Sequence, residues 1–446
     1  PEYLMNPNVK VNLDSRDPSD DIRSIFNPER LLDHPKINAD YLIEEITRCH
    51  GCGLCLTFCP ALQKEYREEF SPRARTNILR AMLTGNIEPS SYSDTEFKAL
   101  MNHCVYCKQC LEKCPSLIDV ARLSSYGKSW FWDEHRPGPA LGLLTSSRSM
   151  GKMGHLAPGL TNRVMNSSGA RAVLEKITSL DHHRGLLPLD ATPYHPKHYR
   201  SSESRKKAVL FAGCHGIFFD REGEMLPAAE ILYGLGYDTV IVDDVCCGIA
   251  KLSHGLLDKG KKLLGEAIHR LLPFAQQSIP ILFTAPSCFS AIKEESLHFL
   301  PGSESQIVSE QSLDIHQFLY EIEKVHQSLE LKPEEKKVAY HHPCHYKASI
   351  PINFPFLLLK AATNGAARLL ESNCCGMAGT YGLFQQNFES SLQIGKELAD
   401  QLSQLNADYI LSSPCGTCQF QIFQMTGKRP VHPIRLVHQS LFQRAG

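Results

Sequence analysis

The sequence predicts a multidomain α+β chain in which a helical domain is followed by a duplicated pair of α/β domains. Two observations carry this prediction. A run of four cysteines with fixed spacing occurs twice in the N-terminal part, with helix-forming segments between the copies. In the C-terminal half, short apolar strands alternate with amphipathic helices, which is typical of a parallel sheet covered by helices. That half also repeats a Cys-Cys-Gly motif.

Length and composition are those of a globular protein with more than one domain. The chain has 446 residues, of which 42% are hydrophobic and 21% are charged, as is usual for soluble proteins. The net charge of -1 argues against a nucleic-acid partner, which would favour a basic face. We find neither the run of about 18 apolar residues that a membrane-spanning helix needs nor a charged-then-apolar leader.

The N-terminal cysteines form two runs with the spacing C-x2-C-x2-C-x3-C-P. Each cysteine of the second run lies 55 residues after its counterpart, so the unit is duplicated. This spacing is the bacterial pattern for paired [4Fe–4S] clusters, in which the fourth cysteine of each run ligates the other cluster. The predicted ligands are Cys49, Cys52, Cys55 and Cys114 for one cubane cluster, and Cys104, Cys107, Cys110 and Cys59 for the other.

Zinc and disulfide bonds are the alternatives for these cysteines. Zinc sites usually pair two CxxC units across a gap instead of placing four cysteines in one run. Disulfides require an oxidising compartment, and the cysteine total of 17 is odd. The pattern therefore favours iron–sulfur clusters, and Gly51 and Gly53 allow the first loop to fold tightly around one of them.

Three segments of different composition precede the repeated half. A serine-proline start and a glycine stop predict a helix over 71–84, and a second amphipathic helix is expected over 94–103. The only tryptophans are Trp130 and Trp132, for which packing inside the protein and contact with a membrane or a quinone are the alternatives. The segments are an extended lead-in, a helical domain with both cysteine runs, and a connector with helical pieces, over 1–40, 41–127 and 128–205.

The two α/β repeats are predicted over 206–330 and 331–446, and we call them copy one and copy two. Their apolar runs predict six strands, at 207–213, 239–243, 280–285, 337–342, 366–371 and 408–412. Their amphipathic segments predict helices at 223–236, 256–274, 353–363 and 386–404.

The remaining nine cysteines lie in the two copies, and all except Cys418 occupy corresponding positions, with offsets of 130, 128, 128 and 127 residues. Each lies beyond the predicted carboxyl end of a strand, where α/β sheets bind ligands, so the thiols of each copy are expected to converge from three loops. With the eight cysteines of the two runs they use all 17. They are Cys214, Cys246, Cys247 and Cys288 in copy one, and Cys344, Cys374, Cys375, Cys415 and Cys418 in copy two.

The copies differ at the last cysteine, because copy one has Ala291 where copy two has Cys418. The four thiols of copy one could hold an altered cluster or none. Copy two also contains His341, His342 and His345, which could bond to cluster sulfurs, relay protons or lie in solvent. The chain has neither a G-x-G-x-x-G segment after a strand nor a P-loop, so a flavin is expected on a partner or an upstream domain.

These motifs resemble the Cys-Cys-Gly domain iron–sulfur oxidoreductase family. The stretches 372–384 (SNCCGMAGTYGLF), 180–184 (LDHHR) and 432–434 (HPI) are similar to the iron–sulfur subunit of anaerobic glycerol-3-phosphate dehydrogenase. The C-terminal half is also similar to the iron–sulfur subunits of glycolate and D-lactate oxidases and to the catalytic subunit of heterodisulfide reductases. Residues 4–7 and 22–37 resemble the tail of a flavin domain, as found in fused FAD/iron–sulfur dehydrogenases.

The resemblance implies an oxidoreductase component of a respiratory chain. FAD on a partner dehydrogenase, which would oxidise glycolate, D-lactate or glycerol 3-phosphate, would pass electrons through the [4Fe–4S] clusters towards a quinone or a similar acceptor. The location would be cytoplasmic, with peripheral attachment to the membrane or to a membrane anchor. The resemblance further implies a non-cubane [4Fe–4S] cluster held by Cys344, Cys374, Cys375, Cys415 and Cys418.

One alternative remains open for the function. The resemblance to heterodisulfide reductases also allows a catalytic subunit that reduces a disulfide at the non-cubane cluster. A cavity beside Cys344 and Cys375 that admits a thiol substrate would favour it. The sequence identifies no catalytic residue for either reading.

Overall fold

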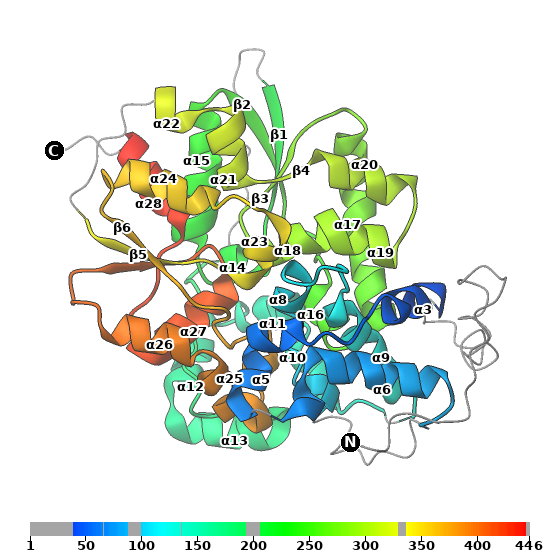
Figure 1. Cartoon of the computed structure of the whole chain (residues 1–446). Coiled ribbons are helices and arrows are strands. Elements are labelled where there is room, and N and C mark those ends of the chain that lie inside the picture. Colours follow the sequence, from blue (N-terminus) through cyan, green and yellow to red (C-terminus); the bar gives the residue numbers. More distant parts are fainter. Residues whose placement is uncertain are drawn as a thin grey trace.

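The computed structural model of the chain describes residues 39–65, 67–87, 100–134, 136–192, 206–328 and 336–442. Nearly all of the predicted lead-in over 1–40 lies outside these residues, as do both segments that resemble a flavin-domain tail. Figure 1 shows the helical N-terminal part packed below two sheets that belong to the two halves of the C-terminal region.

The region with the two cysteine runs is helical. Helix α6 (Pro72–Leu83) confirms the helix predicted over 71–84: the Ser71 hydroxyl caps it by accepting a hydrogen bond from the Ala74 N–H at 2.9 Å, and proline is favoured at its first position. Most of the helix predicted over 94–103 lies outside the described residues. The other helices are α3 (Ala39–Thr47), α4 (Leu54–Phe58), α5 (Pro60–Glu65), η1 (Glu68–Phe70), α8 (Gln109–Glu112) and α9 (Val120–Glu134).

Four helices follow α9 before the first sheet. The side chain of Trp130 is buried, and the half-buried Trp132 donates its indole N–H to the carbonyl oxygen of His254 at 2.9 Å. The tryptophans therefore pack against copy one, as the first of the two alternatives predicts. The four helices are α10 (Pro139–Leu144), α11 (Ser147–Gly154), α12 (Pro158–Asn166) and α13 (Ser168–Thr178).

Copy one contains a parallel sheet with the strand order β2-β1-β3-β4. Strand β4 was not predicted, because its three residues form no apolar run. The strands are β1 (Lys206–Phe211), β2 (Tyr237–Val242), β3 (Ile281–Phe283) and β4 (Ser312–Asp314). The helices and helical turns are α14 (Cys214–Phe218), η3 (Arg221–Met225), α15 (Leu226–Gly234), α16 (Ile249–Ser253), α17 (Leu257–Ala275), α18 (Pro286–Ser290), η4 (Ala291–Glu295), α19 (Ser296–Phe299), α20 (Ser303–Gln311), α21 (Ile315–Gln317), η5 (Phe318–Ile322) and α22 (Val325–Ser328).

Copy two contains a parallel sheet with the order β6-β5-β7, and Val431 forms a further parallel bridge to Ser412 of β7. The single helix predicted over 386–404 is wrong: two helices meet at Gly395, where a Cβ atom would lie 2.3 Å from the carbonyl oxygen of Cys375. The strands are β5 (Val338–His341), β6 (Ala367–Leu370) and β7 (Ile410–Ser412), so all six predicted strands are confirmed. The helical segments are α23 (Cys344–Ser349), α24 (Phe354–Ala362), η6 (Tyr381–Leu383), η7 (Gln385–Asn387), α25 (Phe388–Ile394), α26 (Lys396–Ser403), α27 (Gly416–Thr426) and α28 (Pro433–Phe442).

The two halves pack against each other through their cysteine-bearing helices. Helix α18, which carries Cys288, contacts α23, which begins at Cys344. A Cβ atom on Gly416 at the start of α27 would lie 2.3 Å from the His215 ring of α14, so only glycine allows this close approach. The C-terminal helix α28 packs on α15 of copy one as well as on α24. The cysteine loops therefore lie in the interior between the halves.

Candidate iron–sulfur centres

The first cysteine run and Cys114 line one cavity. The loop turns through Gly51 and Gly53, whose φ angles are 69° and 80°, and the Arg73 guanidinium donates to the Gly51 carbonyl at 3.0 Å. Burial raises the pKa of the Cys55 thiol to about 11, and the adjacent thiols raise it further. The cavity has a volume of about 120 Å³, and its lining includes Cys49, Cys52, Cys55, Cys110 and Cys114. The four cysteines predicted for the first cluster thus lie together.

Cys59 lies beside the cysteines of the second run. Burial raises the pKa of the Cys110 thiol well above its usual value, and the closest charged neighbours that raise it further are Cys104 and Cys59. Burial also dominates the raised pKa of Cys107, to which Cys110 and Cys59 contribute. The loop turns sharply where Tyr106 and Lys108 have positive φ angles of 56° and 57°. The four cysteines predicted for the second cluster are therefore brought together.

A buried ionic cluster fixes the second run to copy one. The Lys108 ammonium lies between Cys107 and Cys110 in sequence and is 1% exposed, and it pairs with Glu295 and, at 2.9 Å, with Glu294. Arg122 of α9 donates to Glu295 at 2.8 Å and lies 3.3 Å from Asp119. Burial alone would lower the pKa of Lys108, but the surrounding carboxylates, first Glu295, raise it. Lys108 therefore stays charged.

The five cysteines of copy two converge beyond the carboxyl ends of its parallel strands. Hydrogen bonds from the neighbouring thiols of Cys344 and Cys375 lower the pKa of Cys374 well below its usual value. A hydrogen bond from Cys418 lowers the pKa of Cys415 to about 6, and Cys375 bonds to Cys418. The thiols of all five residues are thus linked in one group by contacts between neighbours.

The glycine of the Cys-Cys-Gly motif closes this loop. Gly376 has a φ of 89°, and a Cβ atom there would lie 2.0 Å from the carbonyl oxygen of Ser391. Its N–H points at the Cys374 sulfur, 3.4 Å away. Only glycine satisfies the backbone angle and the close approach at once, and the N–H then stabilises a thiolate.

His341 lies beside two of the cysteines of copy two. One ring nitrogen of His341 and the sulfur atoms of Cys375 and Cys418 all lie within 4.8 Å of one another. The Nδ1 atom lies 3.2 Å from the Ser372 hydroxyl, while the buried Nε2 atom has no hydrogen-bond partner in the described structure. Burial lowers the pKa of His341 to about 3, so the ring is neutral. An unpartnered buried nitrogen is costly, which makes the ring a suitable neighbour for a group bound by these sulfurs.

The other two histidines have different surroundings. The Nε2 atom of His345 lies 2.9 Å from the carbonyl oxygen of Tyr106 in the second cysteine run. His342 lines a surface cavity, and burial lowers its pKa to about 3. His341 is buried, so the alternative of a solvated loop histidine is wrong for this residue, whereas His342 and His345 are half-buried.

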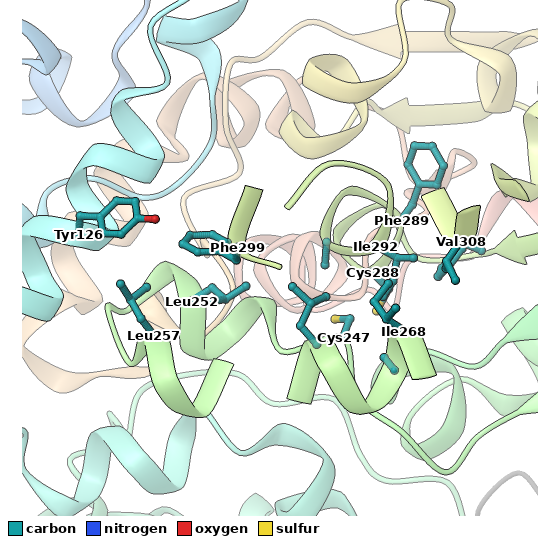
Figure 2. Packing of buried hydrophobic residues seen from close by; sticks show 14 of the residues in the cluster. Tyr126, Cys247, Leu252, Leu257, Ile268, Cys288, Phe289, Ile292, Phe299 and Val308 are labelled. Carbon is teal, nitrogen blue, oxygen red and sulfur yellow. The ribbon is translucent and has the colours of Figure 1, made fainter. Parts of the chain in front are cut away.

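Copy one brings its four cysteines together in the same way, without a fifth. Hydrogen bonds from Cys214 and Cys247 lower the pKa of Cys246, and Cys247 bonds to Cys288. Figure 2 shows the side chains of Cys247 and Cys288 close to each other within the hydrophobic core. Ala291, at the position of the missing cysteine, is fully buried.

The surroundings of the copy-one cysteines also differ from those of copy two. Phe211 stands at the end of β1 where copy two has His341 at the end of β5. Arg148 of α11 donates to the Val245 carbonyl at 2.9 Å, and its charge contributes to lowering the pKa of Cys246. Copy one is thus a four-thiol site with an aromatic neighbour in place of the imidazole.

The second cysteine run directly adjoins copy two. Cys107 packs in one hydrophobic cluster with Cys374 and Cys344, together with Val105 and Tyr381. Burial raises the pKa of Cys107, and the charge of the Cys374 thiolate raises it further. Groups bound at the two sites would therefore be neighbours without intervening solvent.

Arg184 is a buried residue at the copy-two site whose role we did not predict. Its guanidinium donates to Gln421 at 2.6 Å and to Ser391 at 3.2 Å, and it lies over the Phe388 ring at 4.6 Å. Burial lowers its pKa to about 10, although the Asp181 and Cys375 charges act in the opposite direction. The similarity of the LDHHR stretch pointed to this segment, but only the fold places a cation beside the Cys-Cys-Gly loop.

A surface cavity of about 550 Å³ lies next to the copy-two loop. It includes Ser372 and Asn373, which immediately precede Cys374, but none of the five cysteines. A cavity that admits a substrate to Cys344 and Cys375, as the disulfide-reductase alternative requires, is therefore not found there. Its lining residues are His342, Lys347, Leu369, Leu370, Glu371, Ser372, Asn373, Glu397, Asp400 and Gln401.

The donor sets fit iron–sulfur clusters. Thiolates are the ligands that such clusters require, and the fold brings four or five cysteine thiols together in each group. Within the residues described, no helix combines the length and the apolar character needed to span a bilayer.

Comparison with known proteins agrees with these sites. A 4Fe–4S dicluster domain model matches residues 45–118, and a cysteine-rich domain model named for the Cys-Cys-Gly motif matches residues 338–423. A subunit of the anaerobic glycerol-3-phosphate dehydrogenase of Escherichia coli (strain K12) is 27% identical over 321 residues, covering 70% of this chain and 79% of that protein. The probable glycolate oxidase iron–sulfur subunit of Bacillus subtilis (strain 168) is 24% identical, covering 78% and 82%.

A third relative belongs to a reductase. This subunit of the dihydromethanophenazine:CoB–CoM heterodisulfide reductase of Methanosarcina acetivorans is 22% identical, covering 87% of this chain and 90% of that protein. The chain therefore matches a dicluster domain model and a Cys-Cys-Gly domain model, and it is similar to subunits of a glycerol-3-phosphate dehydrogenase, a glycolate oxidase and a heterodisulfide reductase.

Proposed function

We propose that this chain is the electron-transfer component of a flavin-dependent dehydrogenase whose substrate is glycerol 3-phosphate or a 2-hydroxy acid such as glycolate or D-lactate. The observation that carries the proposal is the contact between Cys107 of the second run and Cys374 and Cys344 of copy two. Electron transfer through a chain of redox groups requires these groups to be neighbours. This contact supports direct electron transfer between the second cubane cluster and the copy-two cluster.

In this proposal the cysteines retain their predicted ligand roles. A [4Fe–4S] cluster supplies one-electron redox chemistry, with a potential set by its charge, hydrogen bonds and burial. The first two sets, Cys49–Cys52–Cys55–Cys114 and Cys104–Cys107–Cys110–Cys59, hold cubane clusters. The five thiols of copy two hold a non-cubane cluster, and copy one holds either an altered cluster or none.

The chain's own residues place and tune these sites. Lys108 and its carboxylate partners hold the second run against copy one, and the buried Arg184 puts a positive charge near Cys375. A cation near a cluster favours its reduced, more negative state. The chain thus provides distance, burial and charge, while the partner provides the substrate site.

We further propose that 206–330 and 331–446 are duplicated domains of one kind. The shared central strand order, β2-β1-β3 in copy one and β6-β5-β7 in copy two, supports the duplication. The corresponding cysteine positions beyond the strand ends support it as well. Copy two retained the full thiol set, while copy one lost one thiol.

The donor in this proposal is FAD on a partner subunit or an upstream domain, and the acceptor is a quinone or a similar carrier. The names of the relatives, a glycerol-3-phosphate dehydrogenase subunit and a glycolate oxidase subunit, support this donor class. We propose a cytoplasmic location with peripheral attachment to the membrane. The domain limits 1–40, 41–127 and 128–205 also remain part of the proposal, although α9 runs unbroken across residue 127.

The disulfide-reductase alternative is supported by the similarity to the heterodisulfide reductase of Methanosarcina acetivorans. It would make copy two an active site instead of a relay. The surface cavity of about 550 Å³ approaches Cys374 only through Asn373 and Ser372, which favours the relay.

The Cys107→Ser variant tests the relay. We expect the complex with its flavoprotein to keep dehydrogenase activity with an artificial dye that takes electrons at the flavin. Quinone reduction should fall about a hundredfold or more, because one station is lost. Loss of dye reduction in a folded, flavin-loaded complex would show that the relay assignment is wrong.

Anaerobic iron and sulfide quantitation tests the cluster assignment separately. Two cubanes and the copy-two cluster require about twelve iron atoms per chain. A value of about sixteen would add a cluster in copy one, and about eight would leave copies one and two without iron.

A further inference from the structure

The connector helices α11–α13 expose a concentration of large apolar side chains. Their exposed fractions range from 61% to 86%. Met153 lies on α11, Leu156 in the turn that follows it and Leu160 on α12, and the last two are four residues apart on one face of α13. These side chains are Met153, Leu156, Leu160, Val173 and Ile177.

Helices α12 and α13, which carry Leu160, Val173 and Ile177, lie side by side. Helix α12 packs against α13, and Figure 1 shows both at the lower edge of the molecule. We call the exposed side of α11–α13 the connector face. Elsewhere in the described chain, exposed large apolar residues are scattered singly, which is normal for soluble proteins.

The connector face is basic and carries no exposed acid of its own. Between residues 136 and 180 the sequence has six Lys and Arg residues and a single acid, Glu175. That acid is mostly buried and pairs with His182 at 2.8 Å. Lys152, Arg163 and Lys176 are exposed among the apolar side chains.

The fold itself does not need these exposed side chains. Helix α12 is held through its other face, where Asn162 and the backbone of Leu189 exchange hydrogen bonds of 2.8 Å. Helix α13 is held by Arg171, which donates to the Arg184 carbonyl at 2.8 Å. The apolar and cationic groups of the connector face are therefore available to a partner.

We propose that the connector face docks on an anionic lipid surface. A helix face that combines apolar residues with Lys and Arg inserts its apolar side chains at the headgroup boundary, while its cations contact anionic lipids. A protein partner fits less well, because Lys is depleted at the centres of protein interfaces and aromatic residues are enriched there. The five apolar side chains here are all aliphatic or Met.

Docking would hold copy two close to the bilayer. Helix α13 continues into Leu180 and Asp181, which bond to Phe384 and Leu383 beside the Cys-Cys-Gly loop. Arg184 of the same segment reaches Ser391. The use of this proximity, delivery of electrons to an acceptor dissolved in the membrane, rests on the proposed function, but lipid binding itself does not.

Vesicle flotation of the purified, cluster-loaded chain tests the docking. We expect binding to phosphatidylcholine vesicles that contain phosphatidylglycerol, weakened by salt, and little binding to phosphatidylcholine alone. The double variant L160E/I177E should bind about tenfold or more weakly. The charge reversal R163E/K176E should remove the preference for the anionic lipid.

The matched control is Ile322→Glu, which places an acid on an exposed isoleucine between Glu321 and Glu323, away from the connector face. It should bind vesicles as the unaltered chain does. Iron content and circular dichroism establish that all variants are folded. Equal binding of the unaltered chain and L160E/I177E would overturn the proposal.

A second measurement separates a lipid surface from a protein partner. If L160E/I177E keeps vesicle binding but loses the flavoprotein subunit in gel filtration, the connector face is a subunit interface and the proposal is wrong. If the variant loses vesicle binding and keeps the flavoprotein, the proposal holds. A failed Cys107→Ser relay test would leave either result unaffected.

Discussion

Copy one and copy two place the same motif on sheets with the same central strand order, yet only copy two offers a complete and polar site. Copy two has five linked thiols, the imidazole of His341 and the nearby cation Arg184. Copy one has four thiols and the nearby cation Arg148, but Phe211 and the packed Ala291 stand in place of the imidazole and the fifth thiol. The same motif is therefore surrounded by different side chains in the two copies, with Phe211 in place of His341 and Ala291 in place of Cys418.

The neighbours of the two copies differ in a related way. Cys107 of the second run packs against the copy-two thiols, whereas the contact of that run with copy one is the ionic cluster of Lys108, Glu294 and Glu295. The second run thus contacts copy two through cysteine side chains and copy one through ion pairs. In the proposed relay, copy two is therefore the neighbour of the second cysteine run, while copy one anchors that run through the ionic cluster.

Matched cysteine substitutions should give the largest difference between the copies. We expect Cys375→Ser to remove about four iron atoms and most quinone reduction, because it breaks the thiol group of copy two. Cys247→Ser, its counterpart in copy one, should leave the iron content unchanged. Iron quantitation and EPR of the two variants check this, and equal iron losses would end the distinction between the copies.

The ionic attachment to copy one should give the next largest effect. Lys108→Ala leaves the buried Glu295 without its lysine partner, so we expect a loss of about 3–5 kcal/mol in the free energy of unfolding. Anaerobic denaturant unfolding measures it. The control is Lys113→Ala, which removes an exposed pair with Glu112 and should cost about 1 kcal/mol or less. Equal losses would mean that the buried cluster does not hold the second run in place.

Exchange of the residue at the strand end should give the smallest effect. His341→Phe copies the residue of copy one into copy two, and we expect the reduction potential of the copy-two group to fall by about 40 mV. That value corresponds to one hydrogen bond of about 1 kcal/mol to a cluster sulfur. The reciprocal Phe211→His should change no potential.

A redox titration followed by EPR measures both exchanges. Ser372→Ala is a third variant, because the Ser372 hydroxyl lies 3.2 Å from the His341 ring. Its loss should free the ring and reproduce part of the fall in reduction potential. An unchanged potential in His341→Phe would leave the imidazole with a packing role only.

Much of the site could be predicted from cysteine spacing, because short loops bring nearby residues together whatever the rest of the fold does. The grouping of Cys49, Cys52 and Cys55 with Cys114 is an example, and the cavity they line agrees with it. The apolar runs likewise predicted six strands. Strand β4 and the break at Gly395 were missed, because the first depends on a neighbouring strand and the second on the carbonyl of Cys375, twenty residues earlier in the chain.

The sequence by itself determined which residues could bind iron and sulfur, since ligand chemistry and loop spacing are local properties. Only the tertiary structure decided which sites are neighbours. It brings Cys107 into contact with Cys374 and buries Lys108 among carboxylates that are far away along the chain. It also leaves Leu160 and Ile177 exposed. Such relations follow from the packing of whole layers, in which each helix buries one face and leaves another for a partner.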